Sequence, residues 1–212
     1  MNLPIGAETE TEFHNIFSGA DGLEVRSALF SLLEASDGTQ FIYGCSAESA
    51  NTGDVFHYLV VKDSSDDLEV RLYDDQFQLR GSTDIGSSGT LFPRFTHAVN
   101  YNQIILNSPD IGFPLWGIVG GTLIQALPQD SINANTPALD LFHGIVCTFA
   151  DRFVWAYANL VQINDPGTEP RTLTAENVLS PGGTVLDMFQ AGDGGNLWVI
   201  TTEGTYQLTA DG

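Results

Sequence analysis

The side chains best suited to catalysis or metal binding are spread along this chain. Its four histidines lie far apart, at His14, His57, His97 and His143. No two of them are separated by the single helical turn that brings a pair of histidines onto one zinc ion. A histidine inside an apolar strand, such as His57, is more often a core or surface residue than a ligand. The histidines therefore predict no metal centre.

Motifs of the common enzyme classes are missing from the sequence. It has no Gly-x-Ser-x-Gly elbow, no Gly-Lys phosphate loop and no dinucleotide fingerprint. The run Gly192-Asp193-Gly194-Gly195 predicts a turn before a strand, because no lysine follows it to bind a phosphate. Two carboxylates would suffice for a glycosidase, but 27 acidic residues do not single out a pair. We expect a protein that is not an enzyme and has no cofactor.

Acidic residues cluster in two short segments. The first holds Asp63, Asp66 and Asp67, and the second holds Asp74 and Asp75. Carboxylates bind calcium through such oxygen atoms, but the spacing of an EF-hand loop is absent. We interpret both segments as solvated turns between strands.

The overall charge limits the partners of the chain. Its 212 residues contain 27 acidic and 7 basic side chains, a net charge of −20, and Lys62 is the sole lysine. Binding to nucleic acid through phosphates needs clustered lysine and arginine, which this sequence lacks. The acidic balance has two interpretations: a salt-adapted or very soluble surface, or a surface that repels a polyanion. Residues 1–70 alone hold 13 acidic and 2 basic residues.

Cysteine use and apolar runs indicate the compartment. Cys45 and Cys147 have no metal-binding spacing and are expected to be buried thiols, with a disulfide as the alternative. No apolar run approaches the roughly 20 residues that span a membrane. Met1–Glu8 has neither the basic start nor the apolar core of a secretion signal. We expect a protein assembled in the cytoplasm, with no membrane-spanning segment.

The pattern of apolar runs predicts an all-β fold of short antiparallel hairpins in a single domain, residues 1–212. Runs of four or five aromatic and β-branched residues alternate with Gly, Pro, Asn and Asp, above all between Phe149 and Leu208. Val55–Val61 is expected to pair with Leu68–Tyr73 across the first acidic turn. Residues 81–93, rich in Gly and Ser, are expected to form a long loop. Residues 1–23 are a possible N-terminal arm.

A weak internal repeat favours a β-propeller or a partial propeller. A polar residue followed by an apolar triplet recurs at Gln40, Gln103, Arg152 and Asn196. The intervals are 103 − 40 = 63, 152 − 103 = 49 and 196 − 152 = 44. Propeller blades repeat at about 40–50 residues. The long first interval is expected to carry an insertion around the 81–93 loop.

The segment from Asn100 to Leu208 resembles the propeller-type hub, nozzle or DNA-stabilisation proteins in the tails of tailed phages. The resemblance rests on the order of five motifs. They are Tyr101–Leu106 before the aromatic loop Gly112–Trp116, then Asp151–Ala156, then Asn164–Pro170, and finally Leu197–Leu208. Members of this family are usually longer. This chain is thus expected to be a reduced or truncated version, or a partial propeller completed by a neighbour.

The resemblance implies a virion structural protein of the tail or head-to-tail connector. Such a protein forms a ring, sixfold or twelvefold in the family, that contacts the portal, an adaptor or other tail proteins and guides or retains packaged DNA. The candidate subunit contacts are Phe13, Phe17, Phe113, Pro114 and Trp116. Asp63, Asp66, Asp67, Asp74 and Asp75 are candidates to face a channel through which DNA passes without tight binding. The alternative is a carbohydrate-binding or glycoside-cleaving propeller.

Overall fold

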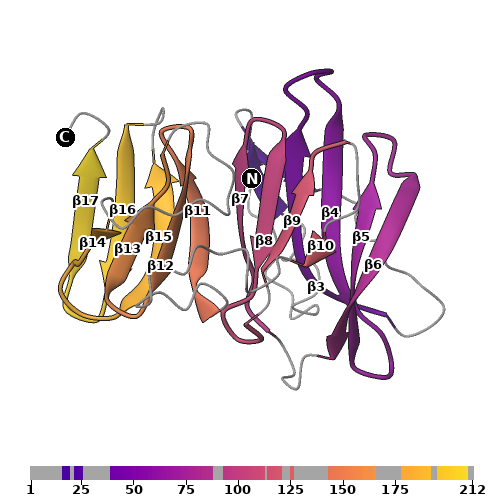
Figure 1. Ribbon diagram of the computed structural model, residues 1–212. Helices are drawn as coiled ribbons and strands as arrows, with labels where there is room; N and C mark the ends of the chain where they lie inside the picture. The colour runs from indigo at the N-terminus through magenta and orange to yellow at the C-terminus, as the bar shows by residue number, and fades with distance from the viewer. Residues whose placement is uncertain are drawn as a thin grey trace, which may run out of the picture.

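The computed structural model (Figure 1) describes residues 16–19, 22–25, 39–87, 93–112, 114–120, 125–126, 143–165, 178–191 and 195–209. These residues form 17 strands. The first two, β1 (Ile16–Gly19) and β2 (Gly22–Val25), pair with each other as an antiparallel hairpin. The other 15 strands form four antiparallel sheets, and in each sheet the strands follow the order of the chain.

The first two sheets have four strands each. The first sheet contains β3 (Gln40–Glu48), β4 (Val55–Lys62), β5 (Asp67–Tyr73) and β6 (Leu79–Ser87). The second contains β7 (Thr96–Asn100), β8 (Gln103–Asn107), β9 (Leu115–Ile118) and the short β10 (Gln125–Ala126). The expected pairing of Val55–Val61 with Leu68–Tyr73 is confirmed as β4 against β5.

The third sheet has four strands and the last has three. The third contains β11 (Ile145–Phe149), β12 (Arg152–Tyr157), β13 (Leu160–Ile163) and β14 (Val178–Leu179). The last contains β15 (Val185–Ala191), β16 (Asn196–Thr201) and β17 (Thr205–Thr209). Figure 1 shows the four sheets side by side, from β6 at one end to β17 at the other.

Short turns hold the hairpins together. Phe149 pairs with Arg152, so Ala150 and Asp151 alone connect β11 to β12. Both residues have positive φ angles, 47° and 56°, the left-handed backbone that matches the right-handed twist of a two-residue hairpin. Alanine rarely adopts this conformation, so the pairing of the two flanking strands must offset its cost.

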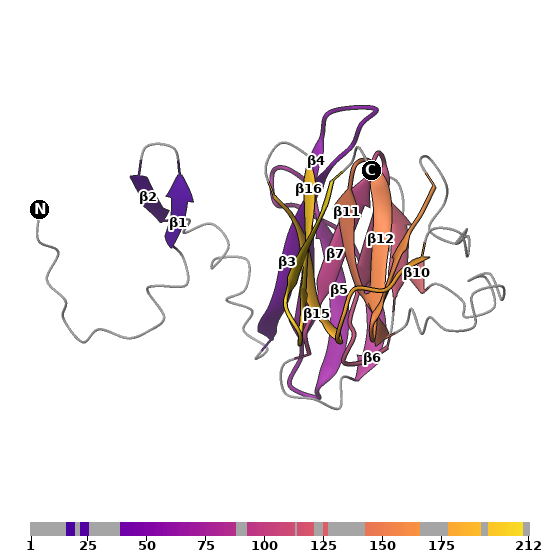
Figure 2. The same ribbon diagram turned by 90° about the vertical axis from the view of Figure 1, so that its left-hand side faces the viewer.

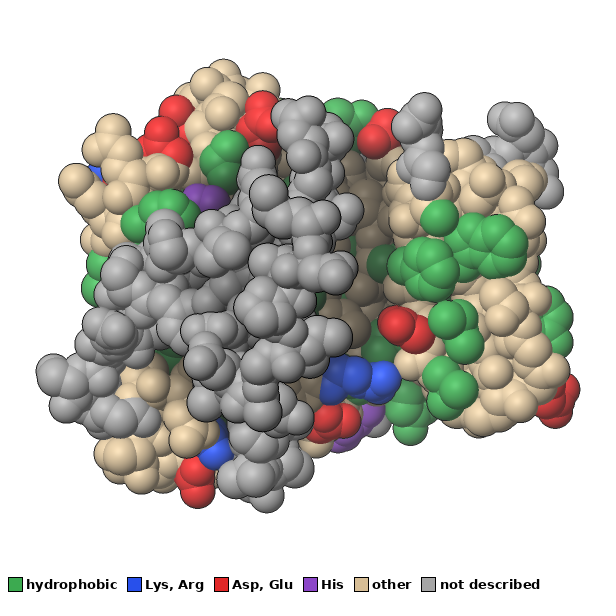
Figure 3. Space-filling view, turned by 180° about the vertical axis from the view of Figure 1, so that it is seen from behind, with side chains coloured by type: hydrophobic (Ala, Val, Ile, Leu, Met, Phe, Trp, Pro, Cys, Tyr) green, Lys and Arg blue, Asp and Glu red, His purple; other side chains and the backbone are tan. Residues whose placement is uncertain are grey.

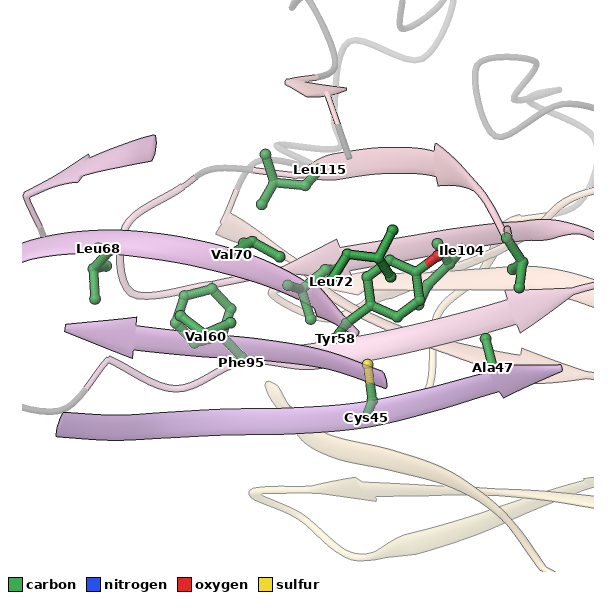
Figure 4. Close-up of a cluster of buried hydrophobic side chains, with 12 residues drawn as sticks. Cys45, Ala47, Tyr58, Val60, Leu68, Val70, Leu72, Phe95, Ile104 and Leu115 are labelled. Atoms are coloured by element: carbon green, nitrogen blue, oxygen red, sulfur yellow. The ribbon is translucent and has the colours of Figure 1, made fainter. Parts of the chain in front are cut away.

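Apolar side chains from facing sheets form the core. Between the first two sheets, Tyr58, Val60 and Leu72 pack against Ile104 and Leu115 (Figure 4). Cys45 lies in the same cluster, while Cys147 lies between the third and last sheets. Both cysteines are free and buried, which confirms the expectation of buried thiols.

The third sheet buries both of its faces, as β12 shows. Phe153 and Trp155 pack toward the second sheet with Ala98 and Ile105. Val154 and Ala156, which alternate with them, belong to the cluster shared with the last sheet. A strand covered on both faces needs an apolar residue at every position. This requirement explains the uninterrupted run Phe-Val-Trp-Ala.

The expected loop at 81–93 is wrong for its first part, because β6 extends to Ser87. Its Gly and Ser residues pair with β5 through the backbone, with two register shifts. Most of the strand is exposed or half-buried. An exposed edge strand needs no apolar side chains, so composition alone mispredicted it.

The expected insertion in the first repeat is also wrong. Gln40 begins β3, the first strand of its sheet, whereas Gln103, Arg152 and Asn196 each begin a second strand. The second strand of the first sheet is β4, which begins at Val55. The matched intervals are 103 − 55 = 48, 49 and 44, and all three agree with the length of a propeller blade.

The arrangement of the sheets is that of a partial β-propeller. The first strands β3, β7, β11 and β15 line one common groove, and Figure 2 shows β3 and β15 on one side of the molecule with β10 on the other. Consecutive sheets pack face to face around that groove. The prediction of an all-β, propeller-like fold is confirmed.

The packing predicts which substitutions destabilise the fold. Phe153→Ala removes a fully buried ring between the second and third sheets, and we expect a loss of about 3–5 kcal/mol in the free energy of unfolding. The control Leu79→Ala changes a side chain that is 56% exposed, with an expected loss below about 0.5 kcal/mol. Urea denaturation measures both, and equal losses would contradict the face-to-face core.

Candidate functional site

The first strands of the four sheets line a groove. It has a volume of about 600 Å³ and is open to solvent. Ligand sites in proteins usually occupy about 300–1,000 Å³. Its lining comes from four segments that are distant in sequence: Tyr43 and Ser46, Phe95 to Val99, Val146 to Thr148, and Asp187 to Gln190.

Threonine side chains join the first strands of the second and third sheets. The Thr148 hydroxyl donates to the carbonyl oxygen of Val99 at 2.7 Å and accepts from its amide at 2.8 Å. Thr96 Oγ1 accepts from the amide of Val146 at 3.1 Å. These hydroxyl groups replace the backbone pairing that two strands of different sheets do not make. Thr96 and Thr148 therefore fix one wall of the groove.

A tyrosine–histidine pair joins the first sheet to the second across the groove. Tyr43 Oη lies 2.6 Å from His97 Nδ1, and the Tyr43 ring stacks on Phe95 at a centroid distance of 5.9 Å. Burial lowers the pKa of His97, so its imidazole is neutral at pH 7. A neutral imidazole accepts the phenolic proton at one nitrogen. The pair is thus an uncharged hydrogen-bonded unit.

The formal charge in the groove comes from Asp187. Burial, and then the charges of Cys45 and Asp187, raise the pKa of Tyr43. Burial first and Asp187 second raise the pKa of Cys147 to about 12. Cys147 is therefore a protonated thiol at pH 7 and a poor nucleophile, because nucleophilic attack requires the thiolate. These groups are suited to non-covalent binding more than to acid–base or nucleophilic catalysis.

Comparison with solved structures agrees with this geometry. The structure of dihydro-heme d1 dehydrogenase NirN in complex with DHE matches with a TM-score of 0.51 and 15% sequence identity. That protein has a propeller fold. The likeness is one of fold alone. The match covers 80% of this chain and 34% of NirN, so the chain spans about a third of that protein's length.

Other comparisons add no family. A crystal structure of Myxococcus xanthus glutaminyl cyclase matches with a TM-score of 0.39 and 9% identity, over 82% of this chain and 72% of that chain. No protein-family model matches the sequence. No curated protein matches it either.

The first acidic turn is solvated, as the sequence predicts. Asp63, Asp66 and Asp67 are all exposed in the turn between β4 and β5. Asp63 Oδ1 accepts from the amides of Ser65 and Asp67, at 2.8 and 3.0 Å. Asp66 pairs with Lys62 at 2.8 Å. Asp63 and Asp66 thus also stabilise the turn, since such short acidic side chains favour tight turns.

Asp74 corrects the expectation of a second solvated cluster, although Asp75 beside it is exposed. The Asp74 side chain is buried, and Oδ1 accepts from the amides of Gln78 at 2.7 Å and Gln76 at 3.0 Å. Its other oxygen accepts from Arg80 Nε at 2.7 Å. The Gln78 hydrogen bond, aided by Arg80, lowers the pKa of Asp74. Asp74 therefore organises the turn before β6 and does not face a channel.

Two residues of the predicted aromatic contact loop have positions inside the fold. Pro114 is buried, and Trp116 lies in β9, where it packs against the core between the second and third sheets. Their role in subunit contacts stays a prediction. Phe17 lies in β1, and Phe13 and Phe113 lie outside the described residues.

Among the described residues, no three His, Cys, Asp or Glu side chains lie close enough together to hold a metal ion. No helix among those residues is long and apolar enough to cross a membrane.

The residues of the groove were not identified from the sequence. Tyr43 and His97 are 54 positions apart, and Asp187 comes from the last sheet. These residues share one feature: each lies in the first strand of its sheet. This feature identifies them only after the first strands have been distinguished from the second strands.

The state of His97 predicts how stability depends on pH. Because burial lowers the folded-state pKa of His97, stability is lost as the pH falls from the unfolded value of about 6.5 through the folded pKa. The urea concentration at the midpoint of unfolding should therefore fall less between pH 7 and pH 5 in the His97→Gln variant than in the native chain. His143→Gln, a change at an exposed histidine, is the control. A proton titration of His97 with a midpoint above 6.5 would contradict this assignment.

Proposed function

We propose that this chain is a non-enzymatic structural protein of a phage tail or head-to-tail connector, and that it forms part of a ring through which DNA passes. One observation carries the proposal. Among the described strands the last sheet has three where the other large sheets have four, and none of them pairs with the outer side of β17. Natural proteins cover or pair such edges, and a neighbouring subunit is one way to do so.

The motif order from Asn100 to Leu208 supports the choice of protein class. Four of the five motifs map onto β8, β9, β12 and β16 to β17, so this part of the resemblance to the phage proteins follows the hairpins of three consecutive sheets. The remaining motif, Asn164–Pro170, lies mostly outside the described residues. The motif residues of β12 and β16 are mostly core residues. The resemblance therefore concerns architecture more than any binding site.

The charged side chains support passage of DNA without tight binding. Three of the five cationic side chains in the described ranges are in ion pairs: Lys62 with Asp66, Arg71 with Glu69, and Arg80 with Asp74. A fourth, Arg94, donates to the carbonyl oxygen of Leu186 at 3.1 Å. Cations held in this way are poorly placed for phosphates, whereas the acids of the β4–β5 turn are exposed. Negative side chains at a channel wall would repel the duplex.

A second candidate, a carbohydrate-binding propeller, is favoured by the lining of the groove. Tyr43 and Phe95 offer aromatic surface, and Gln190 and Asp187 offer polar groups beside it. Sugars are bound by such combinations of apolar faces and hydrogen-bonding groups. If the chain binds carbohydrate, the groove is its functional site. If the chain has the structural role, the unpaired edge of β17 is its functional site.

The structural role predicts that the chain is a constituent of phage particles. Particles purified on a density gradient should contain it in several copies per virion by quantitative mass spectrometry, and portal, terminase and capsid genes should flank its gene. Absence from purified particles would contradict the role. Absence together with neighbouring genes for polysaccharide breakdown would favour the carbohydrate candidate.

The charge arrangement predicts no measurable affinity for duplex DNA. At low salt, where phosphate contacts are strongest, a mobility-shift assay should show no complex up to about 10 µM chain, within the range of ordinary non-specific binding. A basic DNA-binding protein tested in the same buffer is the positive control. A complex that disappears as salt increases would contradict the repulsive surface.

A further inference from the structure

The outer side of β17 is an unpaired strand edge. On its inner side β17 pairs with β16 through five consecutive residue pairs, Asn196–Thr209 to Ile200–Thr205, without a bulge. Among the described strands none pairs with its other side. A regular strand of this kind presents a row of backbone donors and acceptors to a further strand.

This edge lacks the usual protection against pairing. Edge strands are commonly blunted by lysine, proline, inward charges or bulges. β17 has the sequence Thr-Tyr-Gln-Leu-Thr, with no charge and no proline, and four of its five residues are exposed. The outer face of the same sheet exposes Leu186 and Phe189. Figure 3 shows apolar side chains gathered over this end of the molecule.

The same chain contains a hairpin without a sheet. β1 and β2 pair only with each other among the described strands, through four residue pairs from Ile16–Val25 to Gly19–Gly22. An isolated two-stranded hairpin is marginally stable in water and needs a third strand or a packed face. In Figure 2 the hairpin lies apart from the four sheets. The hairpin needs a strand edge, and β17 provides one.

We propose that the β1–β2 hairpin of one copy adds to the β17 edge of a second copy. Strand addition of this kind derives its affinity from main-chain hydrogen bonds, and the four-residue hairpin strands fit a five-residue edge. The added hairpin extends the three-stranded sheet to five strands. This inference deepens the proposed function, on which it rests, because it names the contact between neighbouring subunits.

A second copy fits the geometry better than the same chain does. Figure 2 shows the hairpin well apart from the sheets of its own chain, including β15 and β16 of the last sheet. The donor and the acceptor are different surfaces, so each copy can donate to one neighbour and accept from another. Such a head-to-tail contact repeats, and it produces a ring if the rotation closes.

Charge sets the salt dependence of this contact. Residues 16–25 carry Asp21 and Glu24 and no cation, and the copies that meet are both strongly acidic. Salt screens repulsion between exposed charges, with a screening length of about 10 Å at 0.1 M. Association should therefore strengthen as salt increases. Weaker association at higher salt, measured by sedimentation, would overturn this electrostatic part of the inference.

Cysteine cross-linking between two chains tests the contact. A Ser18→Cys chain and a size-tagged Gln207→Cys chain are mixed and oxidised. The expected result is a reducible heterodimer on a non-reducing gel. The native Cys45 and Cys147 are 9% and 8% exposed, so they should not compete. Ser65→Cys, in the exposed β4–β5 turn, replaces Gln207→Cys as the matched control and should give no heterodimer.

Other outcomes overturn the inference. A Ser18→Cys/Gln207→Cys double variant that cross-links only within single chains shows that the hairpin closes its own sheet. No cross-link in either format places the hairpin elsewhere. Failure of cross-linking removes this contact alone, whereas absence of the chain from virions removes the structural role alone.

A charge on the edge provides a second test that does not depend on oxidation. Tyr206→Glu places a carboxylate on β17 opposite the acidic hairpin and should weaken self-association at least tenfold in sedimentation. Leu79→Glu, on the exposed strand β6 at the other end of the fold, should leave it unchanged. Circular dichroism confirms that both variants are folded. Unchanged association of a folded Tyr206→Glu variant overturns the proposal.

Discussion

Face-to-face packing of consecutive sheets is the interaction on which the rest of the structure depends. A sheet in the middle of the row must bury both faces, so its central strands carry apolar residues at every position. In β12, Phe153 and Trp155 serve one interface, while Val154 and Ala156 serve the next. Among the described strands no backbone ladder connects one large sheet to another. These side chains and a few bridging hydrogen bonds therefore hold the sheets beside one another.

Most of the fold was predictable because neighbouring residues determine the hairpins. The remainder was not, because it depends on pairing and packing between residues that are distant in the sequence. Turn residues and apolar runs are properties of neighbouring positions, so hairpins such as β4–β5 and β16–β17 were found directly. Strand β6 was missed because backbone pairing, which leaves no trace in composition, holds its Gly and Ser residues in place. The blade register was misaligned because β3 and the second strands share a sequence pattern. Only their position relative to the groove distinguishes them.

The groove follows from the same packing and shows why its residues escaped prediction. First strands converge where the sheets come closest, so they need groups that satisfy the backbone between sheets. Thr96 and Thr148 do this with single hydroxyl groups. The Tyr43–His97 pair also joins two sheets, the first and the second, but through a hydrogen bond between side chains. Polar residues that stabilise a junction and polar residues that bind a ligand have the same chemistry. Their sequence pattern therefore does not separate the two roles.

Two opposing interactions between copies act on the row of four sheets, electrostatic repulsion and strand pairing. A net charge of −20 keeps copies of the chain apart at low ionic strength, whereas an open strand edge attracts any available strand. The acids of the β4–β5 turn belong to the first sheet, and β17 of the last sheet carries no charge. Repulsion between copies is therefore weaker at the edge of β17 than at the β4–β5 turn. Negative charge over the whole surface suppresses random association between copies. The uncharged edge of β17 still allows another strand to pair with it in a defined register. Together they favour specific contacts at one end of the fold over aggregation.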